Sequence, residues 1–385
     1  MKVLYDFQAF DLQRFGGVSN YYVQIIRNLP NDVQYEIAVS ESNNMHLRDS
    51  GLVNVRPALL TEEHFITEKR FIGKNRLYRL YSKVFPNKTS FGRNYNKSLE
   101  SLRKRAFDVF HPTFFSDYFL PYLNGKPYVL TIHDMIPELY PNIIGKRSMQ
   151  SVNIRKLSAG ASHIVAVSEN TKNDIMDLLH IPEQKISVIY HAAPEIYENE
   201  TAEAIIKGRY ILYVGKRAGY KNFLAMINEL SPVLKKHHDI KVVCTGETFN
   251  SQEEKNFEKN GIKGRVIHVR ASDSDMMNLY AHAFCFIYPS LYEGFGIPIL
   301  EAWKAGCPVL LNQKSCFPEI TGDASIFFHL DETHSDLTNV MENFIEMSEV
   351  EKAALIQKQN KRLEDFSWKE SAVQLANVYR MVIEH

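Results

Sequence analysis

The chain has 385 residues, and its 45 Lys and Arg residues balance 45 Asp and Glu residues, so it carries no net charge at pH 7. With 45% hydrophobic and 23% charged residues, the composition is typical of a globular protein and excludes a disordered chain. The length exceeds one ordinary hydrophobic core and predicts two domains of roughly 150 to 200 residues each.

Short apolar runs rich in Val, Ile and Tyr alternate with helix-length amphipathic segments, as in parallel βαβ units. In the first half the pattern predicts strands at residues 2–5, 35–39, 108–111, 128–132, 163–167 and 185–190. In the second half it predicts strands at residues 210–214, 241–245, 265–269, 283–288 and 308–311, with helices at 223–235, 251–259, 275–282 and 298–305. This order is typical of an α/β fold with doubly wound parallel sheets.

A basic segment interrupts the pattern in the first half. Residues 69–105 hold twelve Lys or Arg residues and the single acid Glu100, with six Phe and Tyr residues between them. Cations interleaved with aromatic rings suit a membrane interface or a phosphate-bearing partner. A solvated helical face is the alternative interpretation.

A polar stretch between residues 190 and 209 ends at Gly208 and is interpreted as an interdomain linker. We therefore predict an N-terminal domain at residues 1–195 and a C-terminal domain at residues 196–365. Ligands of such sheets bind beyond the carboxyl ends of the strands, so a cleft between facing domains is the expected binding site.

The most informative stretch, residues 289–301, reads PSLYEGFGIPILE and follows an expected strand. Gly294 and Gly296 allow close approach of the backbone, and Pro298 suits the first turn of a helix. The N–H groups at that helix start form a ready site for a diphosphate.

Two carboxylates, Glu293 and Glu301, bracket this turn. Because carboxylates repel phosphates, we expect them to accept hydrogen bonds from sugar and ribose hydroxyls. A dinucleotide-binding oxidoreductase is the remote alternative, since Ile299 replaces the third glycine of the G-x-G-x-x-G fingerprint.

The run EGFGIPILE matches the E-x7-E motif of the retaining glycosyltransferase family 4, whose members have the GT-B architecture of two Rossmann-like domains. Other segments agree with that family in order and spacing: FGGV at 15–18, TIHD at 131–134, VSEN at 167–170 and YVGKRAGYKN at 213–222. The chain resembles the family over nearly its whole length. The resemblance implies an acceptor-binding N-terminal domain, a donor-binding C-terminal domain and a last helix, within residues 366–385, that packs back onto the first domain.

Arg217 and Lys221 lie between an expected strand and helix, where their cations would bind the donor diphosphate and stabilise the departing charge. Lys216 competes for the place of the first cation, because relatives differ in how far that cation follows the glycine. The resemblance implies catalytic roles for His133, Arg217, Lys221 and Glu293, and donor binding by Gly16, Gly17, Asp134, Gly215, Lys216, Gly294, Phe295, Gly296, Ile297 and Glu301.

The run Asp273-Ser274-Asp275 is a D-x-D, which holds a metal in the unrelated GT-A class. Here it stands at an expected helix start, and we interpret Asp273 as an N-cap. No His or Cys cluster has metal-site spacing. We therefore predict no metal and no cofactor, with the nucleotide-diphosphate sugar as substrate.

These features favour transfer of a hexose, with mannose from GDP-mannose first and glucose or a related sugar next, to a glycan or polyprenyl-diphosphate-linked glycan in cell-surface polysaccharide synthesis. Retention of the anomeric configuration is what the resemblance implies. We expect a cytoplasmic protein at the inner face of the membrane, with a peripheral contact through residues 69–105 and no nucleic-acid partner. The alternative is a nucleotide-sugar-binding GT-B protein or epimerase that transfers no sugar.

Overall fold

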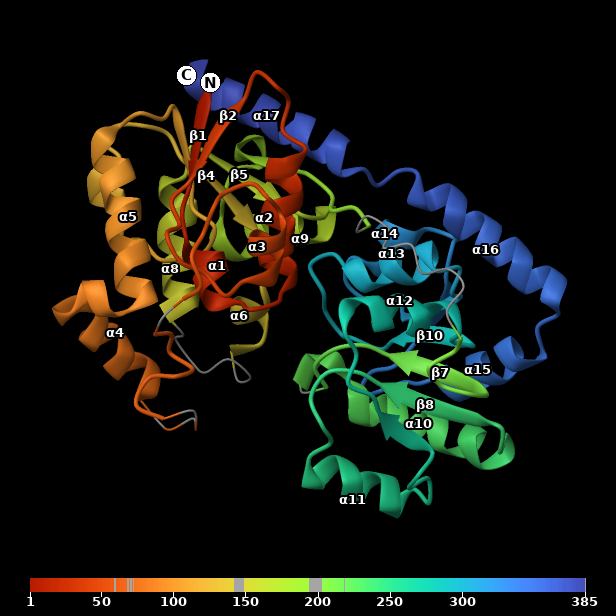
Figure 1. The fold of residues 1–385 in the computed structure, drawn as a ribbon. Coiled ribbons are helices and arrows are strands. Elements are labelled where there is room, and N and C mark those ends of the chain that lie inside the picture. The colour runs from red at the N-terminus through yellow and green to blue at the C-terminus, as the bar shows by residue number, and fades with distance from the viewer. Residues whose placement is uncertain are drawn as a thin grey trace. The chain divides into compact units, whose positions relative to one another are not determined.

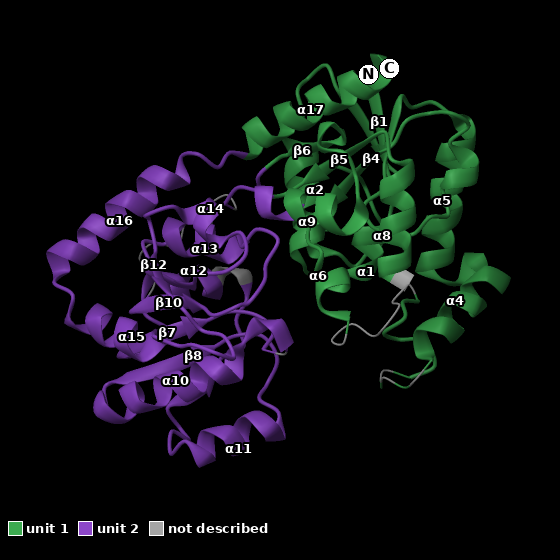
Figure 2. Cartoon of the chain, turned by 180° about the vertical axis from the view of Figure 1, so that it is seen from behind, with its two compact units in different colours: residues 1–167, 172–189, 368–385 green, residues 168–171, 190–367 purple. Residues whose placement is uncertain are grey.

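The computed structural model describes residues 1–58, 60–67, 69, 71, 73–141, 149–193, 203–217 and 219–384. The chain forms two compact units, each built around parallel strands (Figure 1 and Figure 2). Unit 1 comprises Met1–Val167, Lys172–Ile189 and Trp368–His385, and unit 2 comprises Ser168–Thr171 and Tyr190–Ser367. The boundary expected between residues 195 and 196 falls outside the described residues.

Among its described residues, unit 1 contains six short parallel strands: β1 (Lys2–Tyr5), β2 (Gln34–Ile37), β3 (Val109–His111), β4 (Val129–Ile132), β5 (His163–Ala166) and β6 (Ile186–Val188). They pair in the orders β2-β1-β3 and β4-β5-β6, and a parallel bridge between Phe110 and Tyr128 joins the two groups. The strand order therefore reverses between β1 and β3, which is the topological switch point of a doubly wound sheet.

Helices on both faces bury the apolar side chains of these strands. The helices of unit 1 are α1 (Gln8–Leu12), α2 (Gly17–Arg27), α3 (Met45–Asp49), α4 (Lys74–Val84), α5 (Ser90–Lys104), α6 (Ile136–Leu139), α8 (Met149–Gly160), most of α9 (Glu169–Leu179) and α17 (Trp368–Glu384). The basic segment of the sequence forms α4 and α5. Leu102 and Phe110 are fully buried in the core beneath α5.

In the part of unit 2 that the structure describes, six strands form one parallel sheet: β7 (Arg209–Tyr213), β8 (Ile240–Cys244), β9 (Val266–His268), β10 (Cys285–Tyr288), β11 (Val309–Asn312) and β12 (Ile326–Phe328). Their order is β12-β11-β10-β7-β8-β9, with Cys285 opposite Ile211 where β10 pairs with β7. This is the order of a Rossmann sheet, with its switch point between β7 and β10.

The helices of unit 2 are α10 (Phe223–Lys236), α11 (Ser251–Lys259), α12 (Asp273–Ala281), α13 (Ile297–Lys304), α14 (Phe317–Thr321), α15 (Leu337–Glu346) and α16 (Glu349–Leu363). The GT-B fold class expected from the sequence is confirmed, with two doubly wound α/β units. The sequence pattern missed β12, which has only three residues and too little periodicity to detect.

One helix start differs from expectation. The N-cap of α12 is Ser272, whose hydroxyl accepts a hydrogen bond from the backbone N–H of Asp275 while the Asp275 carboxylate accepts one from the N–H of Ser272. The prediction of Asp273 as N-cap was therefore wrong by one residue, because this reciprocal capping box satisfies two N–H groups. The carboxylate of Asp275 serves the helix start.

The last helix, α17, belongs to unit 1, and its end lies beside the N-terminus in both views (Figure 1 and Figure 2). The buried Tyr379 hydroxyl is 2.6 Å from His111 Nδ1 and 2.8 Å from the Tyr5 hydroxyl. His111 Nε2 is in turn 3.0 Å from the hydroxyl of Thr131 in β4. Three strands of unit 1 are thus tied to α17 through buried polar contacts.

The four cysteines are buried thiols without disulfides, as the sequence indicated. Burial raises the pKa of each thiol and keeps it protonated, so these residues act as small apolar side chains. Among the described residues, no helix has both the length and the apolarity that crossing a bilayer requires.

Candidate functional site

The switch point of unit 2 brings together two loops that are far apart in the sequence. One loop follows β7 and contains Gly215, Lys216 and Lys221; the other follows β10 and contains Glu293 and the glycine turn. The backbone N–H of Leu291 donates to the carbonyl of Tyr220 at 2.8 Å, so the loops are hydrogen-bonded to each other. At a switch point, the connections that leave the two adjacent strands run to opposite faces of the sheet. This opens space for a ligand at the carboxyl ends of the strands.

Lys221 and Glu293 meet at this point. Lys221 Nζ lies 2.5 Å from Glu293 Oε1, and both side chains are largely buried, with 17% and 11% of their surface exposed. The ammonium also lies 5.6 Å from the ring centre of Tyr288. A cation and a carboxylate in contact at this point can bind the diphosphate and the sugar hydroxyls of one ligand, respectively.

Glu293 is held in place by the loop after β11. The hydroxyl of Ser315 donates to the carbonyl of Glu293 at 2.7 Å and accepts from its N–H at 3.2 Å. Asn312, fully buried at the end of β11, donates to the carbonyls of Pro289 and Leu330. These two supporting residues were not identifiable from the sequence, because a Ser or Asn in a loop carries no signal until its contacts are known.

Arg217 has a different environment from Lys221. Its guanidinium forms an ion pair with Glu253 at 2.8 Å, and the two side chains are only 5% and 6% exposed. Its other N–H groups donate to the carbonyls of Thr245, Glu247 and Thr248 in the loop after β8. These contacts fix the β8 loop and leave little of the guanidinium for a ligand.

Lys216, by contrast, is exposed directly after Gly215. Gly215 has a φ of 106°, and its carbonyl lies so close to Gly246 that a Cβ on Gly246 would be only 2.8 Å away. The hydroxyl of Tyr213 donates to the carbonyl of Lys216 at 2.6 Å and fixes the backbone of this turn. The Lys216 side chain is therefore exposed to solvent at this turn, whereas the Arg217 side chain is not.

The glycine turn leads into α13 as expected. Gly296 is the N-cap with a left-handed φ of 98°, the helix begins at Ile297, and Pro298 lies in its first turn. The carbonyl of Gly294 accepts a hydrogen bond from the hydroxyl of Ser168 at 2.7 Å. The carbonyl of Phe295 accepts from the thiol of Cys316. These two hydrogen bonds fix the backbone of the turn, which places its N–H groups at the start of α13.

Glu301 lies one turn into α13, and its carboxylate accepts a hydrogen bond from the hydroxyl of Tyr280 at 3.1 Å. Tyr280 is fully buried in α12. This contact holds the carboxylate of Glu301 near the helix start. Glu301 follows Glu293 by eight residues in the sequence.

The remaining predicted residues lie in unit 1. Gly16 and Gly17 form the start of α2, where the side-chain oxygen of Gln13 accepts from the N–H of Ser19 at 3.1 Å. His133 follows β4 and packs edge-on against the Tyr21 ring at 4.9 Å. The carboxylate of Asp134 accepts from the N–H of Ile136 at the start of α6. Burial lowers the pKa of His133 to about 4, so its imidazole is neutral at physiological pH.

Unit 1 also contains a cavity of about 1490 Å³ near its own switch point. Phe7 and Gln8 after β1 and Phe114 to Tyr118 after β3 form one side, and residues of α4 and α5 form another. Asp11 lies in this cavity, and burial raises its pKa to about 7. Asp11 was not identifiable from the sequence, because its neighbours in the cavity come from distant segments.

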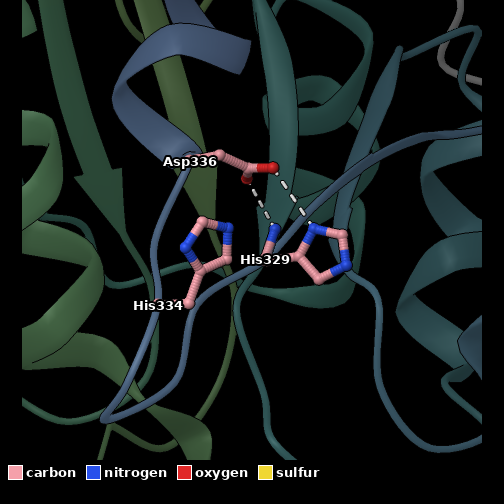
Figure 3. A group of neighbouring side chains, drawn as sticks. All are labelled: His329, His334 and Asp336. Carbon is pink, nitrogen blue, oxygen red and sulfur yellow. Dashed lines mark hydrogen bonds and ion pairs between the residues drawn. The ribbon is translucent and has the colours of Figure 1, made fainter.

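One further cluster could hold a metal ion. His329, His334 and Asp336 lie around the turn between β12 and α15, with one ligand atom of each within 4.8 Å of the others (Figure 3). The Asp336 carboxylate accepts from the backbone N–H of His329 at 2.7 Å and is 3.2 Å from its Nδ1. These contacts join the two ends of the turn, which accounts for the closeness of the side chains. The expectation that no metal is bound stays a prediction.

Two protein-family models cover most of the chain: the Glycosyltransferase Family 4 model matches residues 15–194 and the Glycosyl transferases group 1 model matches residues 197–362. The chain is a glycosyltransferase of family 4 with the GT-B fold. The two loops at the switch point of unit 2 of this glycosyltransferase lie within the second match.

Among curated relatives, the glycosyltransferase is 25% identical to the O-antigen chain mannosyltransferase RfbU of Salmonella typhimurium over 56% of its own length and 60% of that protein. It is 25% identical to the O-antigen chain mannosyltransferase B of Escherichia coli over 69% and 73%. The crystal structure of Anabaena HepE with UDP-glucose has a TM-score of 0.70 at 16% identity, covering 99% of this chain and 100% of that one. The matches to these mannosyltransferases span about two thirds of their lengths.

Proposed function

We propose that this enzyme transfers a hexose, with mannose from GDP-mannose as the first candidate, from a nucleotide-diphosphate sugar to a growing glycan. The contact between Lys221 and Glu293 at the switch point of unit 2 is the main support. The relation to two O-antigen chain mannosyltransferases favours mannose and a role in cell-surface polysaccharide synthesis.

In this proposal the donor diphosphate binds at the start of α13 and contacts Lys221 and Lys216. The Lys221 ammonium is paired with Glu293 in this structure. It would stabilise the negative charge that develops on the leaving diphosphate as the bond to the sugar breaks. Glu293 would then accept hydrogen bonds from the sugar hydroxyls, and Glu301 from the ribose. Retention at the anomeric carbon, with the departing phosphate accepting the acceptor proton, remains part of the proposal.

The cavity of unit 1 is the proposed acceptor site. Its aromatic side chains, including Phe7, Phe91 and Tyr95, offer apolar faces to sugar rings. With a pKa of about 7, Asp11 is partly protonated near neutral pH and can both donate to and accept from a sugar hydroxyl. A glycan, free or linked to a polyprenyl diphosphate on the cytoplasmic side of the membrane, is the acceptor class we propose.

A thermal-shift comparison tests the identity of the donor. GDP, UDP and ADP sugars should be compared by thermal shift, because a ligand that binds the folded state alone raises its melting temperature. We expect GDP-mannose to give the largest shift, and an equal response to all three would contradict the choice of base.

A second measurement tests the type of reaction. Nucleotide release that requires an acceptor distinguishes a transferase from an epimerase or a binding protein.

The catalytic role of Lys221 is tested by Lys221→Ala. We expect turnover to fall roughly a hundredfold or more, the usual effect of losing one transition-state donor. Lys236→Ala is the matched control, because Lys236 pairs with Glu342 on the surface formed by α10 and α15. Unchanged turnover in Lys221→Ala would refute the role, provided that the control is also unchanged.

A further inference from the structure

One face of helix α4 (Lys74–Val84) anchors it to unit 1. Lys74, Tyr78 and Ser82 are its buried residues, spaced four apart along the helix. Lys74 Nζ donates to the carbonyls of Glu63 and Thr67, and the Tyr78 hydroxyl donates to the carbonyl of Leu60 at 2.8 Å. This face fixes the helix, and Tyr81 adds a ring contact with Phe65 at 5.2 Å.

A second face of α4 is apolar and exposed. Leu77, Leu80 and Val84 are 47%, 60% and 62% exposed, and their spacing of three and four residues places them in one stripe. Phe85, which follows the helix, is also exposed. Six of the fifteen exposed large apolar side chains in the described residues lie between residues 66 and 85. Such a concentration on one short segment indicates a surface that another partner covers.

A third face carries positive charge. Arg76, Arg79 and Lys83 are exposed and precede the three apolar residues by one position each, so their stripe runs beside the apolar one. Glu100 is the single acid in residues 69–105, and it forms an ion pair with Lys104 on α5. The exposed side of α4 is therefore half apolar and half cationic, with no acid of its own.

We propose that this exposed side of α4, the stripe of Leu77, Leu80 and Val84 with its row of cations, docks on an anionic lipid bilayer surface. A short helix with an apolar face and adjacent Lys and Arg residues is the pattern of an interfacial helix. The apolar side chains would enter the boundary of the acyl chains, and the cations would contact lipid phosphates. A protein partner fits less well, because a stripe about 11 Å long is small for a stable protein interface.

The position of α4 gives the docking a consequence for the acceptor. Arg79, Ser82 and Lys83 line the cavity of unit 1, so the same helix borders both the cavity and the proposed lipid surface. A lipid-linked glycan could then enter the cavity from the bilayer plane. Only this consequence depends on the proposed function, since the docking itself is argued from the surface of α4.

The test is co-sedimentation of the full chain with vesicles of phosphatidylcholine alone or with about 30% phosphatidylglycerol. We expect binding to the anionic vesicles and release when salt is raised from about 0.05 M to about 0.5 M. Arg76→Gln with Lys83→Gln should lower the partition coefficient roughly thirtyfold, because each cation near such a surface contributes about a fivefold factor. Leu80→Gln with Val84→Gln should lower it roughly tenfold or more.

Matched controls lie in unit 2. Val350→Gln removes an apolar side chain that is 79% exposed on α16, and Lys255→Gln with Lys259→Gln removes two exposed cations of α11. Neither should change vesicle binding. The proposal is overturned if the α4 variants bind like the wild type, or if binding ignores lipid charge and salt.

A different occupant of the stripe would give a different result. If a second copy of the chain covers it, Leu80→Gln with Val84→Gln would change the sedimentation coefficient of the protein without vesicles and leave vesicle binding unchanged, which also overturns the proposal. Donor-induced thermal shifts measured on the same variants report on the nucleotide-sugar site alone. A failure of lipid docking is thereby separated from a failure of the proposed transferase function.

Discussion

At the scale of single residues, neighbours in the sequence have unlike roles. Lys216 is exposed at a glycine turn, whereas Arg217 is buried and paired with Glu253. Arg217 was expected to bind the diphosphate, but its guanidinium is already used by one carboxylate and three carbonyls. We therefore propose that Lys216 and Lys221 supply the positive charge for the donor, and that Arg217 positions the loop after β8.

This assignment predicts opposite phenotypes for two substitutions. Arg217→Ala leaves the Glu253 carboxylate buried without its cation, so we expect the free energy of unfolding to fall by about 3 to 5 kcal/mol. Lys216→Ala should leave that free energy within about 0.5 kcal/mol of the wild type, as for most surface changes, and should weaken donor binding. Urea denaturation and donor titration measure the two effects. A stable Arg217→Ala enzyme that has lost donor binding would reverse the assignment.

At the scale of elements, the glycine turn before α13 depends on a residue without a side chain. Gly296 has a φ of 98°, and a Cβ there would lie 2.9 Å from Ile299 Cδ1 and 3.3 Å from a ring carbon of Phe317. Two separate penalties therefore apply to any substitution: the left-handed backbone and the overlap with neighbouring side chains. The turn exists because both the conformation and the space favour glycine.

Gly264 provides a control for separating these penalties. It also has a left-handed φ, of 82°, but a Cβ there would meet nothing within 4 Å. We expect Gly264→Ala to cost about 1 to 2 kcal/mol of stability from the backbone alone, and Gly296→Ala to cost about 2 kcal/mol more. Thermal denaturation measures both. Equal losses in the two variants would show that packing around Gly296 relaxes freely.

At the scale of the whole molecule, unit 1 is closed by the last helix of the chain. Its contacts centre on His111, which is fully buried between Tyr379 and Thr131. Burial lowers the pKa of His111 to about 3 and that of His133 to about 4, against about 6.5 for an unfolded histidine. Between these values the unfolded chain binds protons that the folded chain does not bind.

The stability of the protein should therefore depend on histidine protonation in acid. The stabilising contribution is fully present above about pH 6.5 and is lost as the pH falls toward 4. The raised pKa of Asp11 acts in the opposite direction, so the comparison of variants is more informative than the wild-type curve. We expect His111→Asn to be less stable at pH 7 and to lose less stability between pH 7 and pH 4. Denaturant midpoints across this range provide the measurement, and parallel pH curves would contradict it.

The sequence alone determined the architecture because alternation of apolar strands and amphipathic helices is a local property. It located the motif around Glu293 and Lys221, since a glycine turn between a strand and a helix can be detected from nearby residues. Of the twelve strands in the described ranges, eleven were located, with ends shifted by at most two residues; β12 was missed. The family was also predicted correctly, because several motifs occur in the right order.

Only the tertiary structure decided which of these residues touch. The contact of Lys221 with Glu293 joins positions 72 residues apart, and Arg217 was matched to Glu253 by the packing of the β8 loop. The exposure of the apolar and cationic stripes of α4 likewise depended on which face unit 1 buries. A side chain's partner is set by strand order and burial, which are long-range properties, whereas its element is set mainly by neighbours along the chain.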